Sequence, residues 1–187
     1  GPLPFIGVLN ECLDEVYNVD CDNKVVLDVG GFIGDTAVFF SKWGAKKVII
    51  YEPVRAHHKF IKINTALNGV NAEIHEEGIG DEDGYMIIHY DTISTGFGFN
   101  EGKHEMKIKI RNVRSMIEGS NADIAKFDCE GAEESLTRVP KEVLRKIDFY
   151  MIEVHTPEIK RAIIDKFKSS GFDFVKDYQS VVFFQKI

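Results

Sequence analysis

Apolar residues follow two alternating patterns along the first eighty positions. Continuous apolar runs at 24–30 and 46–52 predict strands that are buried on both faces. After each run, apolar residues recur at the helical spacing of three or four, over 35–43 and 55–69. A third strand is predicted within 71–80. Alternating strands and helices predict a parallel sheet with helices on both of its faces.

The alternation breaks between residues 84 and 110. Apolar residues there occupy every second position, which predicts two strands, 84–90 and 105–110, of a small β insertion. The long loop between them is either a lid or a plain mobile loop. The elements predicted beyond the insertion are a helix at 113–119, a strand at 122–128, a helix starting near 130, a strand at 146–155, a helix at 157–171 and a terminal hairpin from 172.

We therefore expect one α/β domain over residues 5–187. Its sheet is doubly wound and Rossmann-like, mostly parallel, with a C-terminal antiparallel hairpin, which large mixed sheets tolerate. Helical spacing at 5–19 predicts an additional N-terminal helix. Gly1, Pro2 and Leu3 resemble the remnant of a cleaved tag and are left out of the fold prediction.

Composition and charge narrow the classes of partner. Of the 187 residues, 44% are hydrophobic, enough for one domain with its own core. The net charge is −7, from 30 acidic and 23 basic residues, which disfavours nucleic acids and anionic membranes because both need a basic face. The cysteines Cys12, Cys21 and Cys129 form no C-x-x-C pair, so we expect reduced thiols and a cytoplasmic protein. No apolar segment reaches the ~20 residues of a membrane span.

The segment LDVGGFIGD at 27–35 places glycines where a buried strand turns into a helix. Gly30 and Gly31 allow a sharp turn and a close approach of the backbone to a ligand. Gly34 opens the helix, whose N-terminal N–H groups favour an anionic group such as a carboxylate. Asp28 can accept a hydrogen bond from an ammonium or hydroxyl group of the ligand. In doubly wound folds, ligands bind at this end of the strands.

The dinucleotide fingerprint G-x-G-x-x-G is missing from this turn. Read from Gly30, it requires glycine at Phe32 and Asp35. Read backwards from Gly34, it requires glycine at Val29. A nucleotide-cofactor oxidoreductase is therefore the weaker alternative for this fold.

A different pattern, D-x-G-x-x-x-G, fits Asp28, Gly30 and Gly34. The next predicted strand ends in Glu52, which lies 22 residues after Gly30. An acid at the end of that strand can hold both ribose hydroxyls of a nucleoside cofactor. Together these residues resemble the first two motifs of the class I S-adenosylmethionine (SAM) methyltransferases.

Further motifs resemble the FkbM family of methyltransferases. The segment IAKFDCEGAEESL carries the D-x-E-G-x-E motif of that family as Asp128, Glu130, Gly131 and Glu133. The other stretches that are similar to family motifs are DVGGFIG at 28–34, YEP at 51–53, GIGDEDG at 78–84 and IEVH at 152–155. The resemblance implies SAM as the cofactor and methylation of a hydroxyl on a small molecule or sugar.

The resemblance also implies which residues contact the cofactor. By the resemblance Asp128 would contact the methionine part, while by their positions Glu52 would hold the ribose, and Ile79 and Asp81, which follow the third predicted strand, could flank the adenine or form an ordinary turn. Phe32 stands where the family usually has asparagine, which keeps open an inactive module that binds SAM and acts through a partner. The full expected set of cofactor-binding residues is Asp28, Gly30, Gly31, Phe32, Gly34, Glu52, Pro53, Ile79 and Asp128.

Three residues are candidates for removing the proton of the acceptor hydroxyl. Asp128 and Glu130 follow one predicted strand and His155 ends the next, so all three should meet at one edge of the sheet. A base is useful there because an alcohol is a poor nucleophile until its proton is removed. Alternatively, the carboxylates only cap the next helix, and water or backbone satisfies His155. The three could also hold a divalent ion, but their spacing does not require one and we expect no metal.

The rest of the chain is assigned no chemistry. A chain of this length leaves little room for a separate substrate module, so acceptor recognition would come from the 84–110 insertion, the N-terminal helix or the second subunit of a homo-oligomer. One helix is expected to carry a solvated basic face. The residues of that face are Arg55, His57, His58, Lys59 and Lys62.

Overall fold

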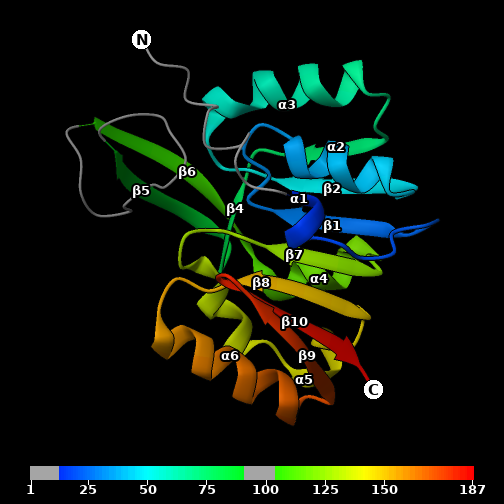
Figure 1. Ribbon diagram of the computed structural model, residues 1–187. Helices are drawn as coiled ribbons and strands as arrows, with labels where there is room; N and C mark the ends of the chain where they lie inside the picture. Colours follow the sequence, from blue (N-terminus) through cyan, green and yellow to red (C-terminus); the bar gives the residue numbers. More distant parts are fainter. Residues whose placement is uncertain (1–12, 91–103) are drawn as a thin grey trace.

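The computed structural model describes residues 13–90 and 104–187, which are built around a seven-stranded sheet (Figure 1). The strand order is β3-β2-β1-β7-β8-β10-β9, with the first five strands parallel and β10 antiparallel to both of its neighbours. The prediction of a doubly wound sheet with a C-terminal antiparallel hairpin is confirmed. The strands of this sheet are β1 (Val25–Val29), β2 (Lys47–Tyr51), β3 (Ala72–His75), β7 (Ile124–Phe127), β8 (Phe149–Glu153), β9 (Phe172–Tyr178) and β10 (Val181–Lys186).

The winding of the sheet reverses at β1. β2 and β3 lie on one side of β1, while β7 and β8 lie on the other. The register pairs Asp28 of β1 with Lys126 of β7, and Val29 with Phe127. A crevice forms where the connections from β1 and β7 diverge, so the motif residues at the ends of these strands meet there.

Helices cover both faces of the sheet. α1, α2 and α3 pack on one face, while α4, α5, α6 and the 3-10 helix η2 pack on the other (Figure 1). The helix predicted after β7 is η2, which is short because Pro140 ends it. The helices are α1 (Leu13–Val16), α2 (Asp35–Lys42), α3 (Arg55–Leu67), α4 (Val113–Ser120), η2 (Ala132–Arg138), α5 (Lys141–Leu144) and α6 (Pro157–Ser169).

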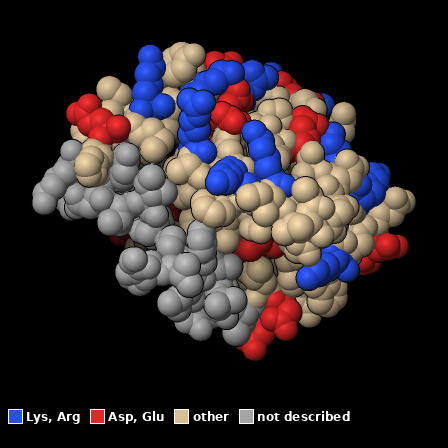
Figure 2. Space-filling view, turned by 90° about the horizontal axis from the view of Figure 1, so that it is seen from above, with Lys and Arg blue, Asp and Glu red and all other residues tan. Residues whose placement is uncertain are grey.

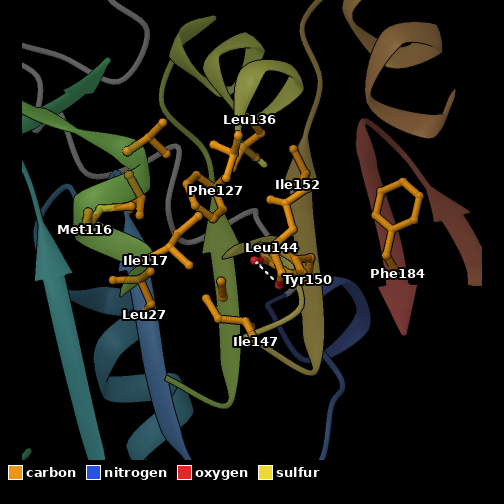
Figure 3. Packing of buried hydrophobic residues seen from close by; sticks show 14 of the residues in the cluster. Leu27, Met116, Ile117, Phe127, Leu136, Leu144, Ile147, Tyr150, Ile152 and Phe184 are labelled. Carbon is orange, nitrogen blue, oxygen red and sulfur yellow. Dashed lines mark hydrogen bonds between the residues drawn. The ribbon is translucent and has the colours of Figure 1, made fainter. Parts of the chain in front are cut away.

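The larger apolar core lies between the sheet and the α4–α6 side (Figure 3). Phe127, Tyr150 and Phe184 belong to it and come from β7, β8 and β10. Tyr150 is fully buried, and its hydroxyl donates a hydrogen bond of 2.9 Å to the carbonyl oxygen of Leu144. Phe167 of α6 stacks on Phe184 and meets Tyr150 edge-on. This layer fixes the strands whose carboxyl ends carry the polar motifs.

A second sheet has three strands in the order β4-β6-β5. Its strands β5 and β6 occupy the region predicted as a β insertion. The segment 71–80, which the pattern predicts as one strand, is divided between the sheets: β3 belongs to the first and β4 to the second, with Glu76 and Glu77 between them. The bounds of the second sheet are β4 (Gly78–Gly80), β5 (Gly84–Tyr90) and β6 (His104–Asn112).

Two predicted features lie largely outside the described residues. Most of the helix predicted at 5–19 falls there, and so does the loop predicted between β5 and β6. Both stay predictions. Among the helices of residues 13–90 and 104–187, none combines the length and the apolar character that a membrane crossing requires.

The predicted basic face of α3 is only half right. Figure 2 looks onto this side of the molecule and shows many Lys and Arg side chains there. His57 and His58 are instead buried, at 4% and 3% exposed, because this side of α3 packs on the end of β2. Nε2 of His58 lies 2.6 Å from the carbonyl oxygen of Glu52. The exposed members of the face are Arg55, Lys59 and Lys62.

Gly30 occupies the closest approach between the turn after β1 and the end of β7. Its φ is +83°, a left-handed conformation that side chains other than glycine adopt with strain. A Cβ atom at this position would lie 1.7 Å from the carbonyl oxygen of Asp128. The turn therefore requires glycine on two independent grounds.

We expect Gly30→Ala to lower the free energy of unfolding by more than the ~1–3 kcal/mol of left-handed strain alone, because Asp128 must also move. Gly69→Ala is the matched control, since Gly69 has a φ of +65° and a Cβ atom added there would meet nothing within 4 Å. Urea unfolding of both variants measures the difference. Equal losses would contradict the steric argument.

Candidate functional site

A cavity of about 580 Å³ opens at the carboxyl ends of the central strands, a size typical of small-molecule sites. Apolar residues of the second sheet, including Met86, Ile88 and Ile108, line one part of it. Ionisable residues at the strand ends line another part. They include Glu52, Lys126, Asp128, Glu130, Glu153 and His155.

The glycine turn after β1 is tied to the end of β2. The backbone N–H groups of Gly30 and Gly31 both donate to the carbonyl oxygen of Tyr51, at 2.8 and 3.2 Å. The next residue, Phe32, has a φ of +42°, and its N–H donates to Oε2 of Glu52 at 3.0 Å. The turn and the β2 carboxylate are therefore positioned together.

Glu52 is held at the cavity wall with both oxygens fixed. Only 5% of the residue is exposed, and Oε1 accepts from the N–H of Val54 at 2.8 Å and lies 3.2 Å from Nδ1 of His57. The ring of Phe32 meets the ring of His57 edge-on, with centroids 4.6 Å apart. Phe32, Glu52 and His57 thus form one continuous part of the cavity wall.

Lys126 is a buried cation at the floor of the cavity. Its Nζ lies 3.0 Å from the carbonyl oxygen of Gly30, 3.2 Å from Oδ1 of Asp28 and 3.5 Å from Oδ2 of Asp128. Burial lowers the pKa of Lys126, but the attraction of Asp28 and Asp128 outweighs it and raises this pKa well above the usual value. Asp28 is fully buried and also accepts from the Thr36 hydroxyl at 2.6 Å. One ammonium group therefore links β1, the glycine turn and β7.

Asp128 and Glu130, after β7, lie beside His155, after β8. Nε2 of His155 is 3.5 Å from Oε2 of Glu130, and Nδ1 is 2.8 Å from Oε1 of Glu133. Glu133 is fully buried, and its Oε2 accepts from the N–H of Gly131 at 2.9 Å. Because Glu133 is fixed in this way, it orients the imidazole ring of His155.

The protonation of these groups follows from their surroundings. Burial raises the pKa of Glu130 and of Glu153, and for Glu153 the nearby charge of Asp128 adds to the rise. The hydrogen bond with Glu133 raises the pKa of His155 to about 9. A protonated imidazole cannot take a further proton, so at neutral pH the carboxylates are the better candidate bases.

A group of three residues also has the spacing of a metal site. One carboxylate oxygen each from Asp128 and Glu153, and one ring nitrogen of His155, lie within 4.8 Å of one another. Glu153 takes the place that Glu130 has in the predicted trio. Such oxygen and nitrogen donors suit several divalent ions. The contact between His155 and Glu133 offers an alternative to a metal ion: a protonated His155 would itself be the cation that the surrounding carboxylates hold.

Most of the predicted cofactor residues line this one cavity, but three lie behind it. Asp28 faces Thr36 and Lys126. A Cβ at Gly31 would overlap Ile50, and one at Gly34 would lie 3.2 Å from Cα of Ile61, so both glycines serve packing. A ligand contact for these three stays a prediction. The predicted residues that line the cavity are Gly30, Phe32, Glu52, Pro53, Ile79, Asp128, Glu130 and His155.

Sequence reasoning missed many of the lining residues, and four of them bear on the chemistry of the site: Tyr17, His57, Lys126 and Glu153. Lys126 is a charged residue inside the four-residue buried strand IAKF, which is an unusual place that signals a buried ion pair. Glu153 belongs to the IEVH segment and lies two residues before His155, so the alternation of a strand places both side chains on the same face. Tyr17 and His57 carried no comparable signal, because their position depends on how α1 and α3 pack on the sheet.

The fold is that of the class I Rossmann-like methyltransferases. A Pyrococcus horikoshii protein described as a candidate RNA methyltransferase has a TM-score of 0.59 at 16% identity, covering 97% of this chain and 85% of its own. The ribosomal protein L11 methylase of Lactobacillus delbrueckii subsp. bulgaricus has a TM-score of 0.55 at 12% identity, and the match covers 92% of this chain and 75% of the methylase. A Streptococcus pneumoniae protein described as a candidate tRNA (m1A22) methyltransferase, in complex with SAM, has a TM-score of 0.56 at 13% identity. The match covers 93% of this chain and 71% of that protein. A search of curated proteins found no match.

The sequence identifies the family of this chain within the fold class. The methyltransferase FkbM domain matches residues 28–176. The chain therefore belongs to the FkbM methyltransferase family and is a SAM-dependent methyltransferase, as the motifs predict.

We expect Lys126→Met to lower the free energy of unfolding by about 3–5 kcal/mol, because it leaves the buried carboxylate of Asp28 without its cation. The double variant Lys126→Met/Asp28→Asn removes both charges, so it should recover much of this loss. Chemical denaturation of both variants measures the difference. If the single and double variants are equally stable, the ion pair is not the cause.

The pH dependence of stability follows from His155. Its pKa of about 9 in the folded state exceeds the ordinary 6.5, so the folded state binds the proton more tightly. The resulting stabilisation is complete below pH 6.5 and is lost as the pH rises through about 9. We expect the difference in unfolding free energy between wild type and His155→Gln to shrink over that range. A difference independent of pH would contradict the assignment.

Proposed function

We propose that the protein transfers the methyl group of SAM to a hydroxyl on a small molecule or sugar. The observation that carries this proposal is the single cavity that joins Glu52 and the glycine turn to the acids at the ends of β7 and β8. A SAM molecule whose ribose is bound by Glu52 and which extends past Gly30 would bring its methionine end to Asp128. An acceptor hydroxyl would then lie among carboxylates that can take its proton.

The donors and acceptors of the cavity fit such a cofactor. Glu52 offers a fixed carboxylate for the ribose hydroxyls, and Phe32 and His57 offer ring surfaces beside it. Asp128 offers a carboxylate for the ammonium group of the methionine part. Gly30 lines the cavity between them, and without a side chain its backbone can come close to the cofactor. When bound, SAM supplies an activated methyl group on sulfur.

The residues of the chain have two tasks in this reaction. The first is positioning, since an in-line geometry at near-attack distance supplies much of the rate of a group transfer. The second is removal of the acceptor proton, which we assign to Glu130 or Asp128. His155 is held protonated by Glu133, so its role is to orient Glu130 from 3.5 Å rather than to act as the base.

The charge of the cavity favours an uncharged or cationic acceptor over a polyanion. Asp128, Glu130 and Glu153 all face the acceptor end, and the chain carries a net charge of −7. Nucleic acids would meet repulsion there. Several solved structures of similar fold are described as RNA methyltransferases, so RNA is the competing acceptor class.

Thermal shift with SAM, S-adenosylhomocysteine and NAD tests the cofactor. Saturation at 100 times the dissociation constant should add ~2.7 kcal/mol of stability with the two adenosyl compounds and nothing with NAD. Glu52→Gln should weaken binding of S-adenosylhomocysteine about tenfold or more, through the lost charged hydrogen bonds to the ribose. Unchanged affinity would remove Glu52 from that role.

An acceptor screen tests the reaction. We expect methyl transfer from labelled SAM to hydroxyl compounds and none to RNA. With the best acceptor, Glu130→Gln should lower kcat about 100-fold, because general-base catalysis contributes on that scale, and leave cofactor affinity unchanged. Binding of SAM without transfer to any acceptor would favour the inactive module, and transfer to RNA alone would overturn the proposed acceptor class.

A further inference from the structure

Tyr17, just after α1, is fixed against the sheet beside the cavity. Its N–H donates to the carbonyl oxygen of Leu13 at 2.7 Å, and its ring meets Phe40 of α2 edge-on, with centroids 6.0 Å apart. Glu15 accepts a hydrogen bond of 3.0 Å from the hydroxyl of Tyr178, which ties α1 to the end of β9. Tyr17 is only 5% exposed, yet it lines the cavity. The surface that it keeps accessible therefore borders the cavity.

The hydroxyl of Tyr17 makes no hydrogen bond to any residue within 13–90 or 104–187, and its oxygen is not among the fully buried atoms that lack a partner, so it keeps some accessible surface. The hydroxyl of Tyr150, by contrast, is fully buried and donates to the carbonyl oxygen of Leu144. Tyr17 thus brings an unused donor to the wall of the cavity. Its partner would come from whatever occupies that space.

Tyr17 lies near the end of the site that is proposed for the methionine part, since Nζ of Lys126 is 6.0 Å from the centre of its ring. The charges that act on Tyr17 are those of Lys126, Asp128, Glu153 and Asp28. Burial raises the pKa of Tyr17 above its usual range, and the opposing effect of Lys126 is smaller. The phenol therefore keeps its proton and remains a donor at every pH at which the protein would work.

The methionine part of SAM carries an ammonium and a carboxylate group. Asp128 and Glu153 can receive the ammonium, but a carboxylate among these acids needs a donor. The ammonium of Lys126 already faces the Gly30 carbonyl, Asp28 and Asp128. Tyr17 offers the donor that no described residue uses.

We propose that the Tyr17 hydroxyl donates a hydrogen bond to the α-carboxylate of SAM. The end of α1 then forms part of the cofactor site. This inference rests on SAM as the cofactor, but it does not depend on the identity of the acceptor.

Calorimetric titration of Tyr17→Phe with two ligands tests the proposal. S-adenosylhomocysteine carries the amino-acid part, and 5′-methylthioadenosine lacks it. We expect the dissociation constant of S-adenosylhomocysteine to rise about tenfold or more, as a hydrogen bond to a charged group implies, and that of 5′-methylthioadenosine to stay the same. Because the substitution removes one oxygen atom with no protein partner, stability should not fall.

The matched control is Tyr150→Phe, which removes a hydroxyl that bonds to Leu144 away from the cavity. It should lower stability and leave both dissociation constants unchanged. Equal affinity of wild type and Tyr17→Phe for S-adenosylhomocysteine would overturn the proposal, and so would equal weakening of both ligands. If wild type bound neither ligand, the cofactor assignment itself would fail, which is a distinct result.

Discussion

The buried ammonium of Lys126 is the interaction on which the geometry of the site depends. An isolated lysine at this depth would lose its hydration and its charge. Asp28 and Asp128 compensate it, and the carbonyl oxygen of Gly30 provides a third contact. These partners come from β1, from the glycine turn and from the end of β7. One cation therefore fixes the relative positions of the two strands between which the winding of the sheet reverses.

The buried ammonium of Lys126 also lets several acidic side chains lie close together in the cavity. Lys126 and the protonated His155 place positive charge near Asp128 and Glu130, and the fully buried Glu133 fixes the imidazole ring. The two cations thus line the same cavity as the carboxylates of raised pKa, Glu130 and Glu153. A group that must accept a proton from a neutral hydroxyl benefits from this distribution, because its pKa lies nearer to neutrality.

The sequence predicted the framework better than the charges. The period of the apolar residues located the strands of the first sheet, and the glycine turn with the D-x-E-G-x-E motif located the crevice and the family. The ion pair of Lys126 with Asp28 could not be derived, because it depends on the register of two strands far apart in the sequence. The burial of His57 likewise depends on how α3 rests on the end of β2, which helical periodicity alone leaves open.

Elements outside the parallel strands complete the cavity and account for its shape. The second sheet adds an apolar wall through Ile88 and Ile108, while the end of α1 adds the ring of Tyr17. The strand ends supply most of the charge, so under the proposed function these added elements would supply the apolar contacts that distinguish one acceptor from another. Under the proposed function the acceptor shares this one cavity with the cofactor, so the space that the cofactor leaves between the second sheet and the strand ends would limit the size of the acceptor.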